Sequence, residues 1–201
     1  MHSLEDNISM NYDNHTLVII GECGTGKSSS LNALFNINRP ISHVEACTLD
    51  VEQTTIDING FGKWIVYDMP GIGESLKTDE KYKELYRKTL PKADVIIWMI
   101  SAGNRALSWM QRTLDMINKD VGEEYASNML FVINKADIMY PNNWNNEDNC
   151  PSEEQEVNLL GFKNTVIECI VDIVPDWKGS IEIISAIKKY RIEELRQRVF
   201  D

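Results

Sequence analysis

The stretch 21–28 limits the fold of this chain more than any other, and it reads Gly-Glu-Cys-Gly-Thr-Gly-Lys-Ser. It matches G-x-x-x-x-G-K-[ST], a pattern whose glycines let the backbone wrap a phosphate chain. The apolar run 17–20 before it predicts a buried strand, and Leu31, Leu34 and Phe35 after it recur at helical spacing. A strand, a loop and a helix in this order predict an α/β fold whose helix N-terminus faces an anion.

Two side chains of this loop have expected chemical tasks. The Lys27 ammonium would reach the β- and γ-phosphates, and the Ser28 hydroxyl would bind Mg²⁺. The alternative is a glycine-rich turn that carries a lysine by chance. The agreement of the flanking strand and helix favours the phosphate-binding interpretation.

Strand-like and helix-like segments alternate along the chain after a first hairpin. We expect strands at 16–20, 51–58, 63–68, 95–100, 129–133 and 181–184, and helices at 27–36, 79–90, 107–119, 152–174 and 191–200. A short link bearing glycines makes the second and third strands antiparallel, and the later alternation implies parallel strands with right-handed crossovers. The expected fold class is α/β, a three-layer P-loop NTPase fold. Its six-stranded, mostly parallel sheet has one antiparallel edge strand and helices on both faces.

Two further segments have local signals. Residues 140–150 are rich in Asn, Pro and Asp, which predicts a loop. Ser152 followed by Gln155 is a capping-box pattern, which places the start of the next helix.

Length and composition favour one globular domain. The chain has 201 residues, 43% of them hydrophobic and 25% charged. We expect a polar N-terminal extension over 1–15 and one domain over 16–201. The longest apolar run, 95–100, is too short to cross a bilayer, and the N-terminus lacks the apolar core of a signal peptide. We therefore expect a cytoplasmic protein without a membrane segment.

Charge and cysteine spacing exclude two other classes. A net charge of −11 does not suit a sequence-independent nucleic-acid binder, which needs a cationic surface. The basic residues of the last helix are interrupted by Glu193 and Glu194, so a solvated face is the favoured interpretation. No zinc-binding or redox spacing joins the four cysteines, which are Cys23, Cys47, Cys150 and Cys169.

Two motifs near the first strands have the character of metal and γ-phosphate contacts. Asp68 and Gly71 fit D-x-x-G, in which the carboxylate holds Mg²⁺ through a water and the glycine N–H meets the γ-phosphate. Taken alone, this segment would be a capping Asp with a Pro-Gly turn. Thr48, in the loop after the first helix, is the favoured threonine ligand of the metal. Thr54 and Thr55 are the alternatives, but they fall in an expected strand.

The motif Asn134-Lys135-Ala136-Asp137 discriminates best between ligands. A carboxylate accepts two N–H donors, and guanine offers such a pair at N1 and N2, whereas adenine does not. Mismatched polar groups of this kind discriminate by about 10⁴-fold. Ser185 and Ala186 follow the last expected strand, where their N–H groups can bind the guanine carbonyl; this pair is a weak signal by itself.

Taken in order, GECGTGKS, Thr48, DMPG, NKAD and Ser185-Ala186 are the five signature boxes of a GTP-binding domain. The chain resembles P-loop GTPases of the translation-factor class, in the Era-like branch. GKSSSLNALF, DMPGIGES, YKELYRKTLPKADVIIWMI and LFVINKAD resemble the YfjP-type bacterial GTPases of that branch. The resemblance covers residues 16–200.

The resemblance implies GTP or GDP and Mg²⁺ as ligands. It implies catalytic roles for Lys27, Thr48 and Gly71, and metal ligation by Ser28, Thr48 and Asp68. The implied nucleotide-binding residues are Glu22, Cys23, Gly24, Thr25, Gly26, Lys27, Ser28, Ser29, Asn134, Lys135, Asp137, Ser185 and Ala186.

The implied function is a molecular switch that hydrolyses GTP and responds to a protein effector. One alternative is an assembly module with negligible turnover, in which two copies pair across their nucleotide faces. Another is a ribosome- or RNA-associated GTPase, against which the acidic charge argues.

Two positions depart from the family pattern. Ile72 follows the D-x-x-G motif where Ras-type proteins have a glutamine that orients water, so we expect slow hydrolysis. Glu74 is the nearest local substitute. Gly24 stands at the fourth loop position, where some Era-like relatives have an asparagine and use K⁺. We therefore expect no strong activation by K⁺.

Overall fold

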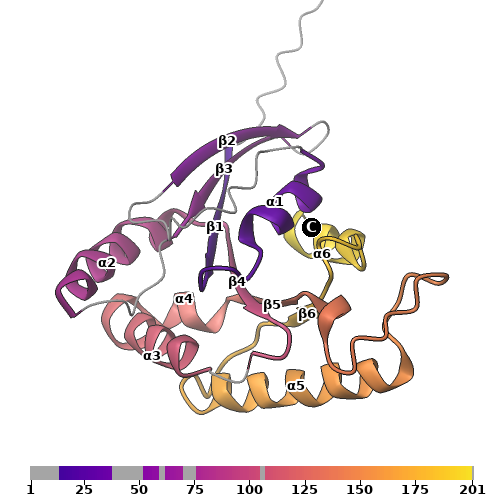
Figure 1. Cartoon of the computed structure of the whole chain (residues 1–201). Coiled ribbons are helices and arrows are strands. Elements are labelled where there is room, and N and C mark those ends of the chain that lie inside the picture. Colours follow the sequence, from indigo (N-terminus) through magenta and orange to yellow (C-terminus); the bar gives the residue numbers. More distant parts are fainter. Residues whose placement is uncertain (1–13, 38–51, 59–61, 70–75, 105–106, 201) are drawn as a thin grey trace, which may run out of the picture.

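The structure is a computed structural model that describes residues 14–37, 52–58, 62–69, 76–104 and 107–200 (Figure 1). Its strands are β1 (Asn14–Gly21), β2 (Glu52–Ile58), β3 (Gly62–Asp68), β4 (Val95–Ser101), β5 (Leu130–Asn134) and β6 (Ile181–Ile183). They form one six-stranded sheet in the order β2-β3-β1-β4-β5-β6. Only β2 pairs antiparallel, with β3, and the other pairs are parallel. The expected sheet with its antiparallel edge strand is confirmed.

The expected helices are all present. They are α1 (Lys27–Phe35), α2 (Leu76–Thr89), α3 (Ser108–Met116), α5 (Glu153–Val171) and α6 (Ile192–Phe200). A short α4 (Glu123–Ser127) was not expected, because five residues are too few to give a periodic apolar signal.

The helix expected over 107–119 differs at its C-terminal end. The α-helical part stops at Met116, and the chain continues as a π-helical turn over Ile117–Val121 before Gly122. The Asn118 side chain donates to the Ile173 carbonyl at 3.1 Å across this turn. A contact with a residue so far along the chain leaves no trace in local periodicity.

The sheet separates two apolar cores. Alternation along β1 sends Val18 and Ile20 into the core under α2, α3 and α5, and Leu17 and Ile19 into the core under α1 and α6. Trp98 and Trp64 are both buried, one in each core. Among the described residues, no helix is both long enough and apolar enough to cross a membrane.

The sheet brings the predicted motifs to one edge. Gly21 at the end of β1 lies beside Met99 of β4, and Ser101 at the end of β4 lies beside Asn134 of β5. In a parallel sheet the loops after the carboxyl ends of the strands converge, and ligands bind there. The phosphate-loop pattern and the N-K-x-D motif are therefore neighbours, although they are far apart in the sequence.

Candidate functional site

The loop between β1 and α1 depends on two glycines. Gly24 and Gly26 have φ angles of 78° and 90°, in the left-handed region that side chains with a Cβ rarely adopt. A Cβ on Gly26 would also collide with the side-chain nitrogen of Asn134. Gly26 is the N-cap of α1 and offers no side-chain hydrogen bond, so the first N–H groups of the helix face the loop.

The Lys27 side chain reaches back from the start of α1 to the beginning of the loop. Its Nζ donates to the Gly21 carbonyl at 3.0 Å and lies 3.8 Å from Oδ1 of Asp68. The first turn of α1, which is fully described, has no acidic residue, and Ser28 is exposed there. An ammonium group and a helix N-terminus free of acidic side chains fit the negative charge of a phosphate chain.

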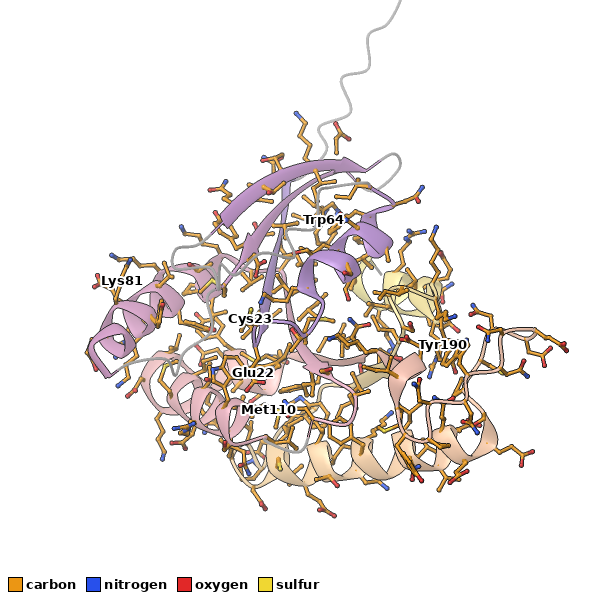
Figure 2. The ribbon with its side chains drawn as sticks, in the orientation of Figure 1. Glu22, Cys23, Trp64, Lys81, Met110 and Tyr190 are labelled. Atoms are coloured by element: carbon orange, nitrogen blue, oxygen red, sulfur yellow. The ribbon has the colours of Figure 1, made fainter. Side chains whose placement is uncertain are left out.

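Glu22, the second residue of the loop, is held by a residue that follows a neighbouring strand. Nδ2 of Asn104, in the segment after β4, donates to Oε2 of Glu22 at 3.1 Å. The N–H and the hydroxyl of Thr25 both donate to the Glu22 carbonyl, at 3.3 and 2.9 Å. Glu22, Asn104 and Met110 line a small pocket between the loop and α3, and Cys23 is exposed beside it (Figure 2). Sequence reasoning missed Asn104, because its contact partner is distant in the chain.

Asn134 connects the loop to the segment after β6. Its Nδ2 donates to the Thr25 carbonyl at 2.9 Å, and its Oδ1 accepts from the N–H of Ala186 at 3.0 Å. The side chain is only 2% exposed. The Ala186 N–H, which we expected to face a base carbonyl, therefore already donates to Asn134. A bound base carbonyl would either share this N–H with Asn134 or replace Asn134 as its acceptor.

Asp137 lies in a short 3-10 turn, η3 (Ala136–Ile138), directly after β5. Lys135 reaches this turn with a φ of 64°, and the N–H of Ala136 donates to Ile184 at 3.0 Å. The Ser185 hydroxyl donates to Oδ1 of Asp137 at 2.5 Å. Because an ionised carboxylate has about four acceptor sites, Asp137 can still accept two further N–H groups.

Gln155 supports η3 from below and was expected only as a helix-capping residue. The capping box is present, since Gln155 N–H donates to Ser152 Oγ and Gln155 Oε1 accepts from the Ser152 N–H, each at 3.2 Å. Its Nε2 also donates to the carbonyls of Asp137 and Met139, at 3.2 and 2.8 Å. The fully buried amide thus fixes the backbone that presents the Asp137 carboxylate.

The predicted metal ligands are only partly covered. Asp68 ends β3 next to Lys27, while Thr48, Gly71, Ile72 and Glu74 lie outside the described residues. In the described part of the chain, no three His, Cys, Asp or Glu side chains form a cluster that could hold a metal ion. A Mg²⁺ ion here would depend on Ser28, Asp68 and phosphate oxygens, which are the oxygen ligands that this ion prefers.

The buried Tyr86 feels the charge of the Asp68 carboxylate. Burial, and then the nearby Asp68 charge, raises the pKa of the Tyr86 hydroxyl, so the phenol stays protonated.

Comparisons with known proteins show the family of this chain. The model of a family described as 50S ribosome-binding GTPase matches residues 16–135. The uncharacterized protein YfjP of Escherichia coli K12 is 40% identical over 142 residues, 70% of this chain and 47% of that protein. The chain spans about half the length of the curated relatives that it matches.

Solved structures share the fold. Era of Aquifex aeolicus, crystallised with GDP·AlF4⁻, is 25% identical with a TM-score of 0.64, over 93% of this chain and 56% of that chain. Toc33 of Arabidopsis thaliana, in complex with GDP and Mg²⁺, is 16% identical with a TM-score of 0.70, over 94% and 83%. For the chloroplast translocon components of this fold, dimerization is important for the GTPase activity.

Proposed function

This chain belongs to the family of 50S ribosome-binding GTPases, and from that membership we propose that it binds GTP, hydrolyses it to GDP and phosphate, and acts as a molecular switch. The observation that carries the proposal is the pair of hydrogen bonds made by Asn134, to Thr25 and to Ala186. They join a phosphate-binding loop and a base-binding segment into one connected unit.

The base is selected by the Asp137 carboxylate. The N1–H and the 2-amino group of guanine supply two donors to it, and adenine supplies no equivalent pair. The half-buried carboxylate would keep its Ser185 contact but lose two N–H donors with adenine, and each lost partner costs about 1–3 kcal/mol, which favours guanine. The Ser185 hydroxyl, hydrogen-bonded to the same carboxylate, fixes its orientation.

The phosphates are bound by the loop after β1. The Lys27 ammonium and the N-terminus of α1 stabilise the charge that develops on the γ-phosphate when water attacks in line. Ser28 and Asp68 would hold Mg²⁺, together with Thr48. When bound, this ion neutralises phosphate charge.

Turnover of the isolated chain is expected to be slow. Ile72 follows the D-x-x-G motif, and a hydrocarbon side chain cannot orient the attacking water. A group supplied by a partner would then complete the site. A pull-down with wild type and Ser28→Asn, each loaded with nucleotide, identifies an effector that binds only the triphosphate-loaded wild type.

The alternative function is that of an assembly module, in which two copies pair across their nucleotide faces. Ile72 favours it, and so does the importance of dimerization for the activity of proteins with this fold. Steady-state phosphate release, measured at rising protein concentration, distinguishes the switch from the assembly module. If the rate per molecule of protein rises with concentration, pairing of two copies contributes to catalysis. Association with ribosomal RNA is the less favoured alternative, because a net charge of −11 opposes binding to a polyanion.

Calorimetric titration with GDP, inosine diphosphate and ADP tests the central claim. We expect tight binding of GDP, weaker binding of inosine diphosphate, which lacks the 2-amino group, and weakest binding of ADP. Equal affinity for GDP and ADP, or no binding of either, contradicts the proposal.

A further inference from the structure

The turn over residues 185–190 carries the two residues expected to contact the base carbonyl. It is closed by two backbone hydrogen bonds between Ser185 and Tyr190, of 3.2 and 3.0 Å. Lys189, within the turn, and Arg191, directly after it, each have a φ angle of 53°. Residues with a Cβ pay roughly 1 kcal/mol or more for this conformation, so the turn needs support from its surroundings.

A second closed loop, over residues 141–150, follows η3 in the chain. Asn145 and Cys150 close it through two backbone hydrogen bonds of 3.0 and 3.2 Å. The Ser152 hydroxyl donates to Oδ1 of Asn143 at 2.5 Å, which fixes the loop to the start of α5. In Figure 1 this loop is the orange segment that projects to the right, next to the first turn of α5. We name it the Asn-rich loop.

The Asn-rich loop packs directly on the 185–190 turn. The rings of Trp144 and Tyr190 meet edge to face, with centroids 5.3 Å apart and an interplanar angle of 87°, and Trp144 is 9% exposed. Figure 2 shows Tyr190 at the base of this loop. Burial raises the pKa of the Tyr190 hydroxyl above its usual value. An aromatic pair of this geometry contributes about 0.5–1.5 kcal/mol beyond the area it buries.

Polar contacts reinforce the aromatic pair. Nδ2 of Asn149 donates to the Lys188 carbonyl at 3.0 Å, and its Oδ1 accepts from the indole N–H of Trp144 at 3.3 Å. Nζ of Lys188 donates to Oδ1 of Asn146 at 2.9 Å. Side chains of the Asn-rich loop therefore contact both the backbone and a side chain of the turn.

We propose that the Asn-rich loop positions the 185–190 turn for guanine recognition, so that Trp144 and Asn149 act as positioning residues for the base pocket. This inference rests on the proposed function. Ser185 holds the Asp137 carboxylate, and the Ala186 N–H is held by Asn134. A displaced turn therefore loosens the carboxylate that reads the 2-amino group as well as the donor beside the base carbonyl.

The test uses the substitution Asn149→Gly, because Asn149 has a φ of 51° that glycine tolerates. It removes both side-chain hydrogen bonds without straining the backbone. We expect fluorescent GDP to dissociate about fivefold faster, equivalent to one net hydrogen bond, and the preference for GDP over inosine diphosphate to narrow. Trp144→Leu removes the aromatic contact, and we expect about tenfold faster dissociation.

Two matched controls separate positioning from general destabilisation. Asn142→Gly makes the same change in the same loop at a φ of 59°, and among the described residues this side chain makes no hydrogen bond to the turn. Trp177→Leu breaks an edge-to-face pair with Phe131, at 5.6 Å, away from the base motif. We expect both controls to keep the wild-type GDP dissociation rate and base preference.

The outcomes are distinguishable. If Asn149→Gly and Trp144→Leu are folded by circular dichroism and retain wild-type dissociation rates and base preference, the positioning role is wrong while guanine binding stands. If Trp144→Leu does not fold, Asn149→Gly decides alone. If the wild type itself does not prefer GDP over ADP, the proposed function fails first.

Discussion

Asn134 and Thr25, 109 positions apart in the chain, are joined by a buried side-chain hydrogen bond of 2.9 Å to the Thr25 carbonyl. The same amide accepts from the Ala186 N–H and lies against Gly26. A residue whose pattern indicates base recognition therefore also fixes the shape of the phosphate loop. We therefore expect affinity for the base and affinity for the phosphates to be coupled through this one side chain.

The substitution Asn134→Ala tests that coupling. It leaves a buried carbonyl and a buried N–H without partners, each costing about 1–3 kcal/mol. We expect the free energy of unfolding in urea to fall by about 2–4 kcal/mol and GDP affinity to fall by about 100-fold or more. Asn158→Ala, which removes an exposed hydrogen bond to Tyr140, should change neither much. Wild-type GDP affinity in Asn134→Ala would show that the link has no functional role.

The Asp137→Asn substitution should change which base is bound. The NH2 group of an asparagine can donate to the C2 carbonyl of xanthine. With guanine, the same NH2 group would face an N–H donor, and the two would repel. We expect GDP affinity to fall by about 100-fold and xanthosine diphosphate to bind better than it binds to the wild type. Asp176→Asn, an exposed site with the same change of charge, is the control. An unchanged order of base affinities would rule out Asp137 as the group that reads the base.

The Gln155→Glu substitution should be severely destabilising. The carboxylate keeps the cap on Ser152, but it turns an oxygen toward the carbonyls of Asp137 and Met139, where the wild type donates. A buried charge among acceptors costs about 3–5 kcal/mol, so we expect a clear fall in the thermal midpoint at pH 7. The neighbouring Glu156 is exposed, and Glu156→Gln should leave the midpoint within about a degree or two. A small effect of Gln155→Glu would show that the capping contact alone matters.

Hydrolysis should not depend strongly on K⁺. Gly24, at the fourth loop position, has no side chain to help ligate a monovalent cation. We expect phosphate release rates in K⁺ and Na⁺ at equal ionic strength to agree within about twofold, a difference of well under 1 kcal/mol in barrier height. A rate many times larger in K⁺ would contradict this, and Gly24→Asn tests whether an asparagine confers the dependence.

Alkylation of Cys23 should block nucleotide binding. Its thiol is exposed within the phosphate loop, so an added group occupies the space where phosphates are expected. Desolvation, with the charges of Asp172 and Glu168, raises the pKa of Cys169, which slows that thiol because the thiolate is the reactive form. We expect iodoacetamide to abolish GDP binding and prior GDP to protect Cys23, as read by mass spectrometry. A Cys23→Ser protein treated in the same way should retain binding.

Local pattern was sufficient for the elements and for the order of motifs. Apolar periodicity gave the strands and the main helices, and the Ser152–Gln155 capping box located the start of α5, because these signals depend on residues within one turn of each other. The short α4 and the π-helical turn after α3 were missed, since neither is long enough to repeat.

The sequence by itself determined the strand–loop–helix with its glycines, the N-K-x-D motif at the end of a strand and the α/β class, since each follows from neighbouring residues. Only the tertiary structure decided that Asn134 holds the phosphate loop, that Gln155 supports η3, and that the Asn-rich loop packs on the 185–190 turn. Each of these contacts joins residues brought together when parallel strands align their carboxyl ends, and a contact between distant positions has no signature in local periodicity.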